Sequence, residues 1–236
     1  MKTIGQKTIL AILLLMFVSI NAIGQNVELH YDFGKKGLTS TVEMFRSDKV
    51  GSTYFFIDME FTPKVSGAYG EIARELCFWQ NSKLDWLSLH VEYNGGLDTV
   101  VGSYNNAWLA GLTYSGHSKD WSKTWSLPAL YKLIPGATGF KGEAQVHNFQ
   151  ITAVWNLDFF NRWLSFNGYA DFWREIRDKQ NTEFMFITEP QLWVNLNKIK
   201  GMENVNLSLG TEVELSANFV DKGFYVIPTL AIKYAF

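Results

Sequence analysis

Residues 87–93, Leu-Ser-Leu-His-Val-Glu-Tyr, decide the fold. The odd positions of this stretch are apolar or aromatic, and the even positions are polar or charged. Successive side chains of a β-strand point to opposite faces, so this period of two predicts a strand with one apolar and one polar face. The same period recurs along most of the chain after residue 24, and no long amphipathic helix interrupts it.

Turn-forming clusters rich in Gly, Asn, Asp and Pro separate about twelve runs of this kind. A tilted strand that crosses a membrane needs about 9–11 residues, so the chain accommodates twelve strands with short connections. The predicted strands are 27–33, 38–46, 52–61, 68–79, 84–93, 104–115, 124–134, 144–156, 163–174, 184–196, 205–217 and 224–236.

The first 24 residues follow a different pattern. Lys2 and Lys7 precede an apolar run at 9–20, and Ala22 and Gly24 place small residues before a cleavage point. This is the layout of a secretory signal peptide, whereas a retained N-terminal membrane anchor would need a longer apolar run. We therefore expect residues 1–24 to be a signal peptide and residues 25–236 to form one domain.

The composition excludes several classes of protein. The chain is 47% hydrophobic and 16% aromatic but 19% charged, and soluble domains are closer to a quarter charged. A mean hydropathy of −0.05 excludes a bundle of membrane helices. The net charge of −2 gives no nucleic-acid footprint. The single cysteine, Cys77, excludes an intrachain disulfide and a cysteine zinc site, and the scattered histidines show no metal-ligand spacing, so we predict no cofactor and no metal.

Two architectures use many alternating strands. A soluble β-sandwich hides its apolar face inside, whereas a transmembrane β-barrel turns that face to lipid and its polar face to the lumen. Along each predicted strand, the alternate positions that form the polar face (the polar parity) carry many carboxylates. Aromatic residues lie near predicted strand ends, as in the aromatic girdles of barrels. We predict an all-β, transmembrane antiparallel barrel in the outer membrane of a Gram-negative cell, with a secreted soluble β protein as the alternative. The apolar set expected to face lipid is Phe55, Ile57, Leu89, Val91, Phe166, Leu207, Leu209, Leu230 and Ile232, and the aromatic set expected at the interfaces is Tyr31, Phe33, Trp79, Tyr93, Trp155, Trp163 and Trp173.

The polar parity supplies candidate lumen residues. Charged side chains are costly against lipid, which directs the carboxylates inward or to the rims. Aromatic residues of the same parity offer flat faces on which a planar solute can stack. The predicted solute-binding residues of the lumen are Asp58, Glu71, Asp171, Glu189, Glu212, Phe56, Tyr69 and Tyr169.

Residues 87–93 also offer a catalytic alternative. Ser88, His90 and Glu92 share one face of one strand, and a serine hydrolase needs such a nucleophile, base and acid within hydrogen-bonding reach. Polar residues in alternation are also what any lumen-facing strand shows. A membrane-embedded barrel hydrolase therefore remains an alternative to a channel, as does a structural barrel without transport.

Several short motifs resemble the nucleoside-specific channel-forming (Tsx-like) outer-membrane proteins. The motifs are Tyr54-Phe55-Phe56-Ile57-Asp58-Met59, Tyr69-Gly70-Glu71, Gly168-Tyr169-Ala170-Asp171, Thr188-Glu189-Pro190-Gln191-Leu192 and Gly210-Thr211-Glu212. The resemblance implies a twelve-stranded monomeric barrel in the lipid bilayer that passes nucleosides and is not an enzyme. That family usually has Pro-Arg after the glutamate of its fourth strand, whereas Ile72 follows Glu71 here, which indicates a separate branch. The final Leu-x-Ile-x-Tyr-x-Phe is similar to the C-terminal signal of outer-membrane barrels.

Overall fold

The computed structural model describes residues 24–100, 102–103, 106–177, 181–219 and 221–236. The predicted signal peptide, apart from Gly24, lies outside the described residues. The strands are β1 (Gln25–Asp32), β2 (Gly37–Asp48), β3 (Gly51–Phe61), β4 (Val65–Leu76), β5 (Leu87–Asp98), β6 (Gly102–Ser103), β7 (Ala107–His117), β8 (Lys123–Leu133), β9 (His147–Phe159), β10 (Leu164–Arg177), β11 (Thr182–Thr188), β12 (Gln191–Asn195), β13 (Leu207–Ala217) and β14 (Phe224–Ala235), with one short 3₁₀ helix, η2 (Leu196–Lys198).

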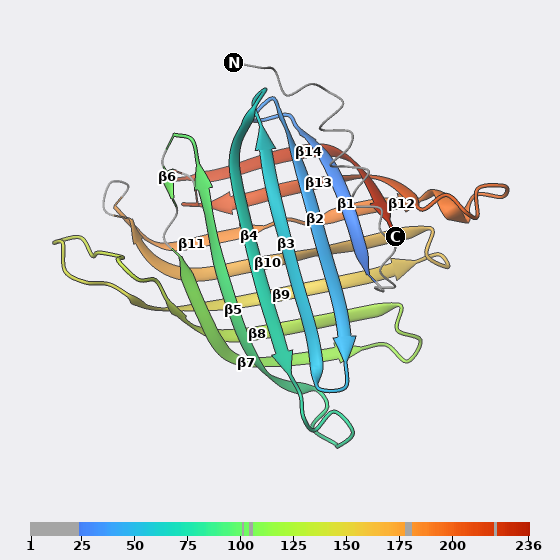
Figure 1. Ribbon diagram of the computed structural model, residues 1–236, viewed down its shortest axis with the longest axis horizontal. Coiled ribbons are helices and arrows are strands. Elements are labelled where there is room, and N and C mark those ends of the chain that lie inside the picture. The colour runs from blue at the N-terminus through green and yellow to red at the C-terminus, as the bar shows by residue number, and fades with distance from the viewer. Residues whose placement is uncertain (1–23, 101, 104–105, 178–180, 220) are drawn as a thin grey trace, which may run out of the picture.

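These strands form one closed antiparallel barrel. Apart from β6, β11 and β12, each strand pairs with its neighbours in chain order, and β1 pairs with β14 from Asn26 opposite Ala235 to Asp32 opposite Thr229. β11 and β12 occupy a single place in the wall between β10 and β13, and β6 is a two-residue strand beside β5. The wall therefore has twelve strands, as predicted. In Figure 1 the strands β1–β5 form the near wall, and β8–β14 cross behind them.

The connection between β4 and β5 is longer than predicted. The alternation predicted a strand to residue 79 and a new one from 84, but β4 ends at Leu76 and β5 begins at Leu87. The indole Nε1 of Trp79 donates to the carbonyl oxygens of Leu84 and Leu87, at 3.0 and 2.9 Å. Trp79 therefore stabilises the turn between β4 and β5 and is not part of either strand.

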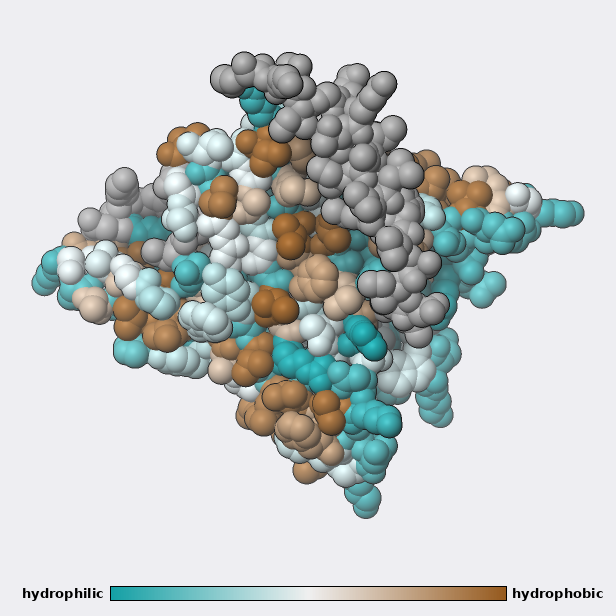
Figure 2. Space-filling view, in the orientation of Figure 1, coloured by the Kyte–Doolittle hydropathy of each residue, from teal (hydrophilic) through white to brown (hydrophobic). Residues whose placement is uncertain are grey.

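The outer surface of the barrel is apolar. Six residues of the predicted lipid-facing set are exposed, and Phe55, Phe166 and Leu207 are half-buried. Exposed fractions of 48% for Ile57 and 63% for Leu230 would be unfavourable in water but suit a lipid environment. Figure 2 shows apolar and weakly polar side chains across the near wall, with hydrophilic side chains gathered towards its right-hand and lower edges. None of the described helices is long and apolar enough to cross a membrane.

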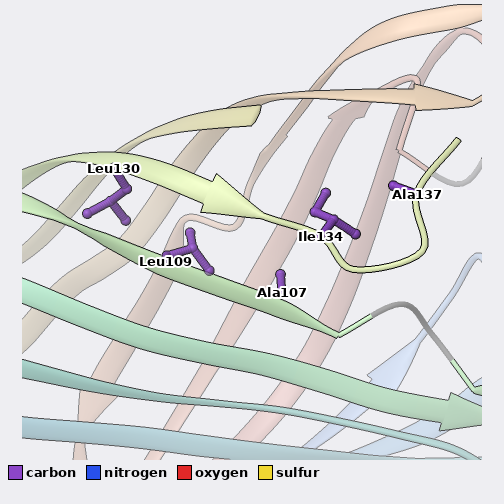
Figure 3. Packing of buried hydrophobic residues seen from close by; sticks show 5 residues of the cluster. All are labelled: Ala107, Leu109, Leu130, Ile134 and Ala137. Carbon is purple, nitrogen blue, oxygen red and sulfur yellow. The ribbon is translucent and has the colours of Figure 1, made fainter. Parts of the chain in front are cut away.

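Part of the interior is also apolar, which the parity argument did not predict. Ala107 and Leu109 from β7, Leu130 from β8 and Ile134 and Ala137 from the connection after β8 pack together inside the wall (Figure 3). A second buried cluster joins Trp173 of β10 to Met185 and Ile187 of β11. The placement of Trp173 in an interfacial girdle was wrong: it is 5% exposed and shares the inward parity of Asp171 on the same strand.

The last residue closes the seam between the first and last strands. The backbone N–H of Phe236 donates to the carbonyl oxygen of Gln25 at 3.1 Å, and its ring lies edge-on to Tyr234 at 5.5 Å. We expect a chain lacking Phe236 to be secreted but poorly inserted, because it loses a ladder hydrogen bond and the terminal aromatic residue. Heat-modifiable gel mobility of outer-membrane fractions measures this, and Phe224→Ala, at the opposite end of β14, is the control. Full insertion of the shortened chain would contradict the prediction.

Candidate functional site in the barrel lumen

The lumen brings the predicted carboxylates together from distant strands. Glu71 on β4 interacts electrostatically with Asp171 on β10 and with Glu92 on β5. The hydroxyl of Tyr69 donates to Glu71 at 2.6 Å, and the hydroxyl of Thr152 donates to Asp171 at 2.5 Å. Because β4 and β10 are not neighbours in the wall, this proximity places the two carboxylates across the lumen from each other.

Tyr169 lies at the centre of the acidic group. Its hydroxyl is close enough to interact with Glu189, Asp171, Glu71 and Glu212. Its ring also packs against the buried cluster of Trp173, Met185 and Ile187. Tyr169 is therefore held by an apolar neighbour on one side and surrounded by acceptor groups on the other.

The remaining predicted acids gather near the seam of the barrel. Glu189 interacts with Glu212 and Asp58, and Asp58 accepts a hydrogen bond from Thr41 at 2.6 Å. Glu212 accepts a hydrogen bond from Gln191 at 2.6 Å. The five predicted carboxylates thus form two adjoining groups that meet at Tyr169.

A break in the wall positions Glu189. β11 ends at Thr188 and β12 begins at Gln191, and Pro190 has no backbone N–H for the ladder. The facing residue on β10 is Gly168, with φ of 150°, where a Cβ would lie 2.4 Å from the carbonyl oxygen of Glu189. Only glycine fits so close to a backbone oxygen, so Gly168 permits the bulge that carries Glu189.

The predicted aromatic residues lie beside the acids but do not form a parallel slot. The rings of Phe56 and Tyr69 are 6.0 Å apart and tilted by 52°, and Tyr54 lies 6.1 Å from Phe56. A flat solute would therefore stack on one of these rings at a time. The stacking hypothesis for Phe56, Tyr69 and Tyr169 stays a prediction.

The closing seam carries a buried ion pair. Lys233 of β14 contacts Glu28 of β1 at 2.7 Å, and Glu28 is 1% exposed. The other oxygen of Glu28 binds His30 at 2.8 Å, and the ammonium group of Lys233 lies 4.2 Å from the ring centroid of Trp193. Charged and aromatic side chains thus join β1, β12 and β14 inside the lumen.

The three residues of the hydrolase alternative all face the lumen, and Glu75 links Ser88 to His90. The hydroxyl of Ser88 donates to Glu75, and no hydrogen bond joins Ser88 to His90 among the described residues. Both ring nitrogens of His90 are engaged, Nδ1 with Glu75 at 2.6 Å and Nε2 with Glu92 at 2.9 Å. A general base needs a free nitrogen beside the nucleophile, so this arrangement builds a buried network and not a catalytic pair.

Sequence reasoning missed several lumen residues. Glu75 shares the parity of Glu71 along β4, so the signal was present in the alternation. Glu43, which accepts hydrogen bonds from Asn26 and Tyr54, lies in a strand rich in Thr and Ser whose alternation is weak. Arg74 has the outward parity and pairs with Asp48 at 2.8 Å, near the ends of β4 and β2, so it lies at a rim of the barrel.

A hollow of about 230 Å³ lies at the mouth beside the turn between β1 and β2. Its lining includes Lys35, which contacts Glu60 at 2.6 Å, and the carboxylates Asp32 and Asp98. Burial lowers the pKa of Lys35, but the hydrogen bond to Glu60 and the charges of Glu60 and Asp32 outweigh it and raise the pKa. Lys35 is therefore charged at neutral pH and lies among the carboxylates that line this mouth of the barrel. The described residues contain no cluster of three or more His, Cys, Asp or Glu suited to a metal ion.

Comparison with known proteins adds a family and a fold. Residues 24–236 match the family model described as "Domain of unknown function (DUF5020)". The chain belongs to this family. No curated protein matches this DUF5020 chain.

Among solved structures, the chain is similar to the NanC porin, with a TM-score of 0.59 and 8% identity over 90% of this chain and 100% of that one. The outer membrane channel DcaP of Acinetobacter baumannii matches with a TM-score of 0.41 and 11% identity, over 85% of this chain and 63% of that one. At these identities the likeness shows the fold alone. The likeness to the NanC porin indicates that the DUF5020 chain has the fold of an outer-membrane porin.

Proposed function

We propose that this chain is a monomeric channel in the outer membrane of a Gram-negative cell and passes small polar solutes, with nucleosides as the first candidates. The observation that carries the proposal is the convergence of carboxylates from β4, β10, β13 and the β11–β12 break around Tyr169, inside a barrel with an apolar exterior. Asp58 of β3 adjoins this group through Glu189. The similarity to the NanC porin supports the barrel architecture on which the proposal depends. The motifs that resemble nucleoside-specific channels support the choice of nucleosides.

The charge of the lumen supports a preference for cations over anions. Carboxylates outnumber the lumen-facing lysines Lys132 and Lys233, and rings of Asp and Glu favour cations in channels. Planar-bilayer recordings of the purified chain test the function directly. Conductance with a cation preference, blocked by nucleosides, supports the proposal, whereas a silent barrel favours a structural role.

Substitution of two central residues separates charge from stacking. We expect Asp171→Asn to reduce the cation preference and leave insertion intact, because the amide removes charge but keeps the acceptor for Thr152. We expect Tyr169→Ala to weaken nucleoside block by roughly 5- to 150-fold, the loss of one stacked base. Reversal potentials and blocking concentrations measure the two effects.

The control for the charge change is Asp120→Asn, in the exposed connection between β7 and β8. Ser88→Ala tests the hydrolase alternative in a parallel esterase assay of the same preparations. Identical selectivity and block in wild type, Asp171→Asn and Tyr169→Ala would refute the lumen site. An esterase activity lost in Ser88→Ala would replace the channel by the enzyme.

A further inference from the structure

Two acceptor atoms on the wall of the lumen lack hydrogen-bond partners. The side-chain oxygen Oδ1 of Asn94 and the oxygen Oε1 of Glu92 have none among the described residues. Asn94 is 4% exposed and the Glu92 side chain is 10% exposed. A buried acceptor without a partner costs free energy, so a donor supplied from outside would bind favourably here.

Glu71 extends this pair into a row. It lies directly opposite Asn94 in the register of β4 and β5, where facing side chains are about 5 Å apart at Cβ. Glu92 precedes Asn94 by two positions and shares its inward face. Glu92 faces Ala73 in the same register, so it is a diagonal neighbour of Glu71, at about 7–8 Å between Cβ atoms. The three side chains therefore present a cluster of oxygen acceptors.

The surroundings of the row favour a cation with an apolar part. Phe56 of β3 lies opposite Glu71 in the register of β3 and β4, and its ring lies 6.0 Å from that of Tyr69. Two aromatic side chains therefore adjoin the carboxylate. The nearest basic group is His90, whose Nε2 binds Oε2 of Glu92 at 2.9 Å and whose Nδ1 binds Glu75 at 2.6 Å. Lys132 donates to Gln150 at 2.7 Å and lies 4.7 Å from the ring centroid of Trp173. Both basic groups thus have hydrogen-bond partners of their own, and Oε1 of Glu92 and Oδ1 of Asn94 stay without one among the described residues.

We propose that Glu71, Glu92 and Asn94 form a binding station for the primary ammonium group of a small organic amine. An ammonium group offers three N–H donors and no acceptor, which matches a cluster of carboxylate and amide oxygens. The alkyl part of the amine lies against Phe56 and Tyr69, where burial of apolar surface adds to the binding. As a statement about transported cargo this rests on the proposed channel function, but the binding itself does not.

Calorimetric titration of the detergent-solubilised full chain with butylammonium, paired with bilayer recordings, tests the station. We expect tetramethylammonium, which has the same charge but no N–H, to bind at least about tenfold more weakly, because it loses the charge-assisted hydrogen bonds. Glu71→Gln and Asn94→Leu should each weaken butylammonium binding by about tenfold or more. Glu203→Gln and Asn197→Leu, in the connection between β12 and β13, are matched controls, and Asn197 also carries an unpartnered buried oxygen.

Each outcome decides a separate claim. Equal affinity for the two cations, or unchanged butylammonium affinity in folded Glu71→Gln and Asn94→Leu, would overturn the station. A chain that conducts ions but binds no butylammonium keeps the channel and loses the station. A chain that binds butylammonium with the expected dependence on Glu71 and Asn94, yet never conducts, keeps the station and refutes the channel.

Discussion

Lys233→Met is expected to lower the free energy of unfolding by about 3–5 kcal/mol, the cost of leaving one partner of a buried ion pair uncompensated. Glu28 is 1% exposed and lies 2.7 Å from the ammonium group of Lys233. His30 stays in contact with the other carboxylate oxygen of Glu28, which keeps the effect within this range. Methionine preserves most of the side-chain volume over Trp193, so the loss reports on charge. Urea unfolding of the barrel in detergent, followed by tryptophan fluorescence, measures the change.

A second substitution shows whether the unpaired charge is the cause. The double variant Glu28→Gln with Lys233→Met should recover most of the lost stability, since both charges are then gone. Lys222→Met, in the exposed connection between β13 and β14, is the control and should change stability by less than about 0.5 kcal/mol. Equal stability of Lys233→Met and wild type would mean that the seam does not depend on this pair.

Leu112→Arg is expected to cost about 2–4 kcal/mol, the penalty for arginine on the lipid face near the bilayer midplane. Leu112 is the sixth residue of the eleven-residue strand β7 and is 49% exposed on the outer surface. The arginine would place a charge in the centre of the apolar band. Folding equilibria in lipid vesicles measure the cost.

The same change nearer a strand end provides the comparison. Leu209 is also 49% exposed but is the third residue of β13, so Leu209→Arg should cost only about 0–1 kcal/mol. Leu112→Met should be close to neutral, because it keeps an apolar side chain. Equal costs at Leu112 and Leu209 would disprove the assignment of membrane depth, and no cost at either position would disprove the lipid-facing outer surface.

Alternation of polarity is a local property, and it accounts for what could be predicted without a structure. Twelve strands, the inward carboxylates and the outward position of residues such as Ile57 and Leu230 all follow from parity along single strands. Even the error at Trp173 was avoidable, because this residue has the parity of Asp171. For Trp173, its position near a strand end predicted an interfacial site, whereas its parity indicated the inward position that the structure shows.

Contacts between strands depend on register, barrel closure and curvature, and none of these is encoded in a single run of residues. The sequence alone determined that Ser88 and His90 share a face, but the register of β4 against β5 decided that both bind Glu75. Closure brought Lys233 to Glu28, more than two hundred residues away along the chain. Curvature brought Asp171 towards Glu71 and gathered the acids around Tyr169, because only a closed wall points inward side chains from opposite strands at one another.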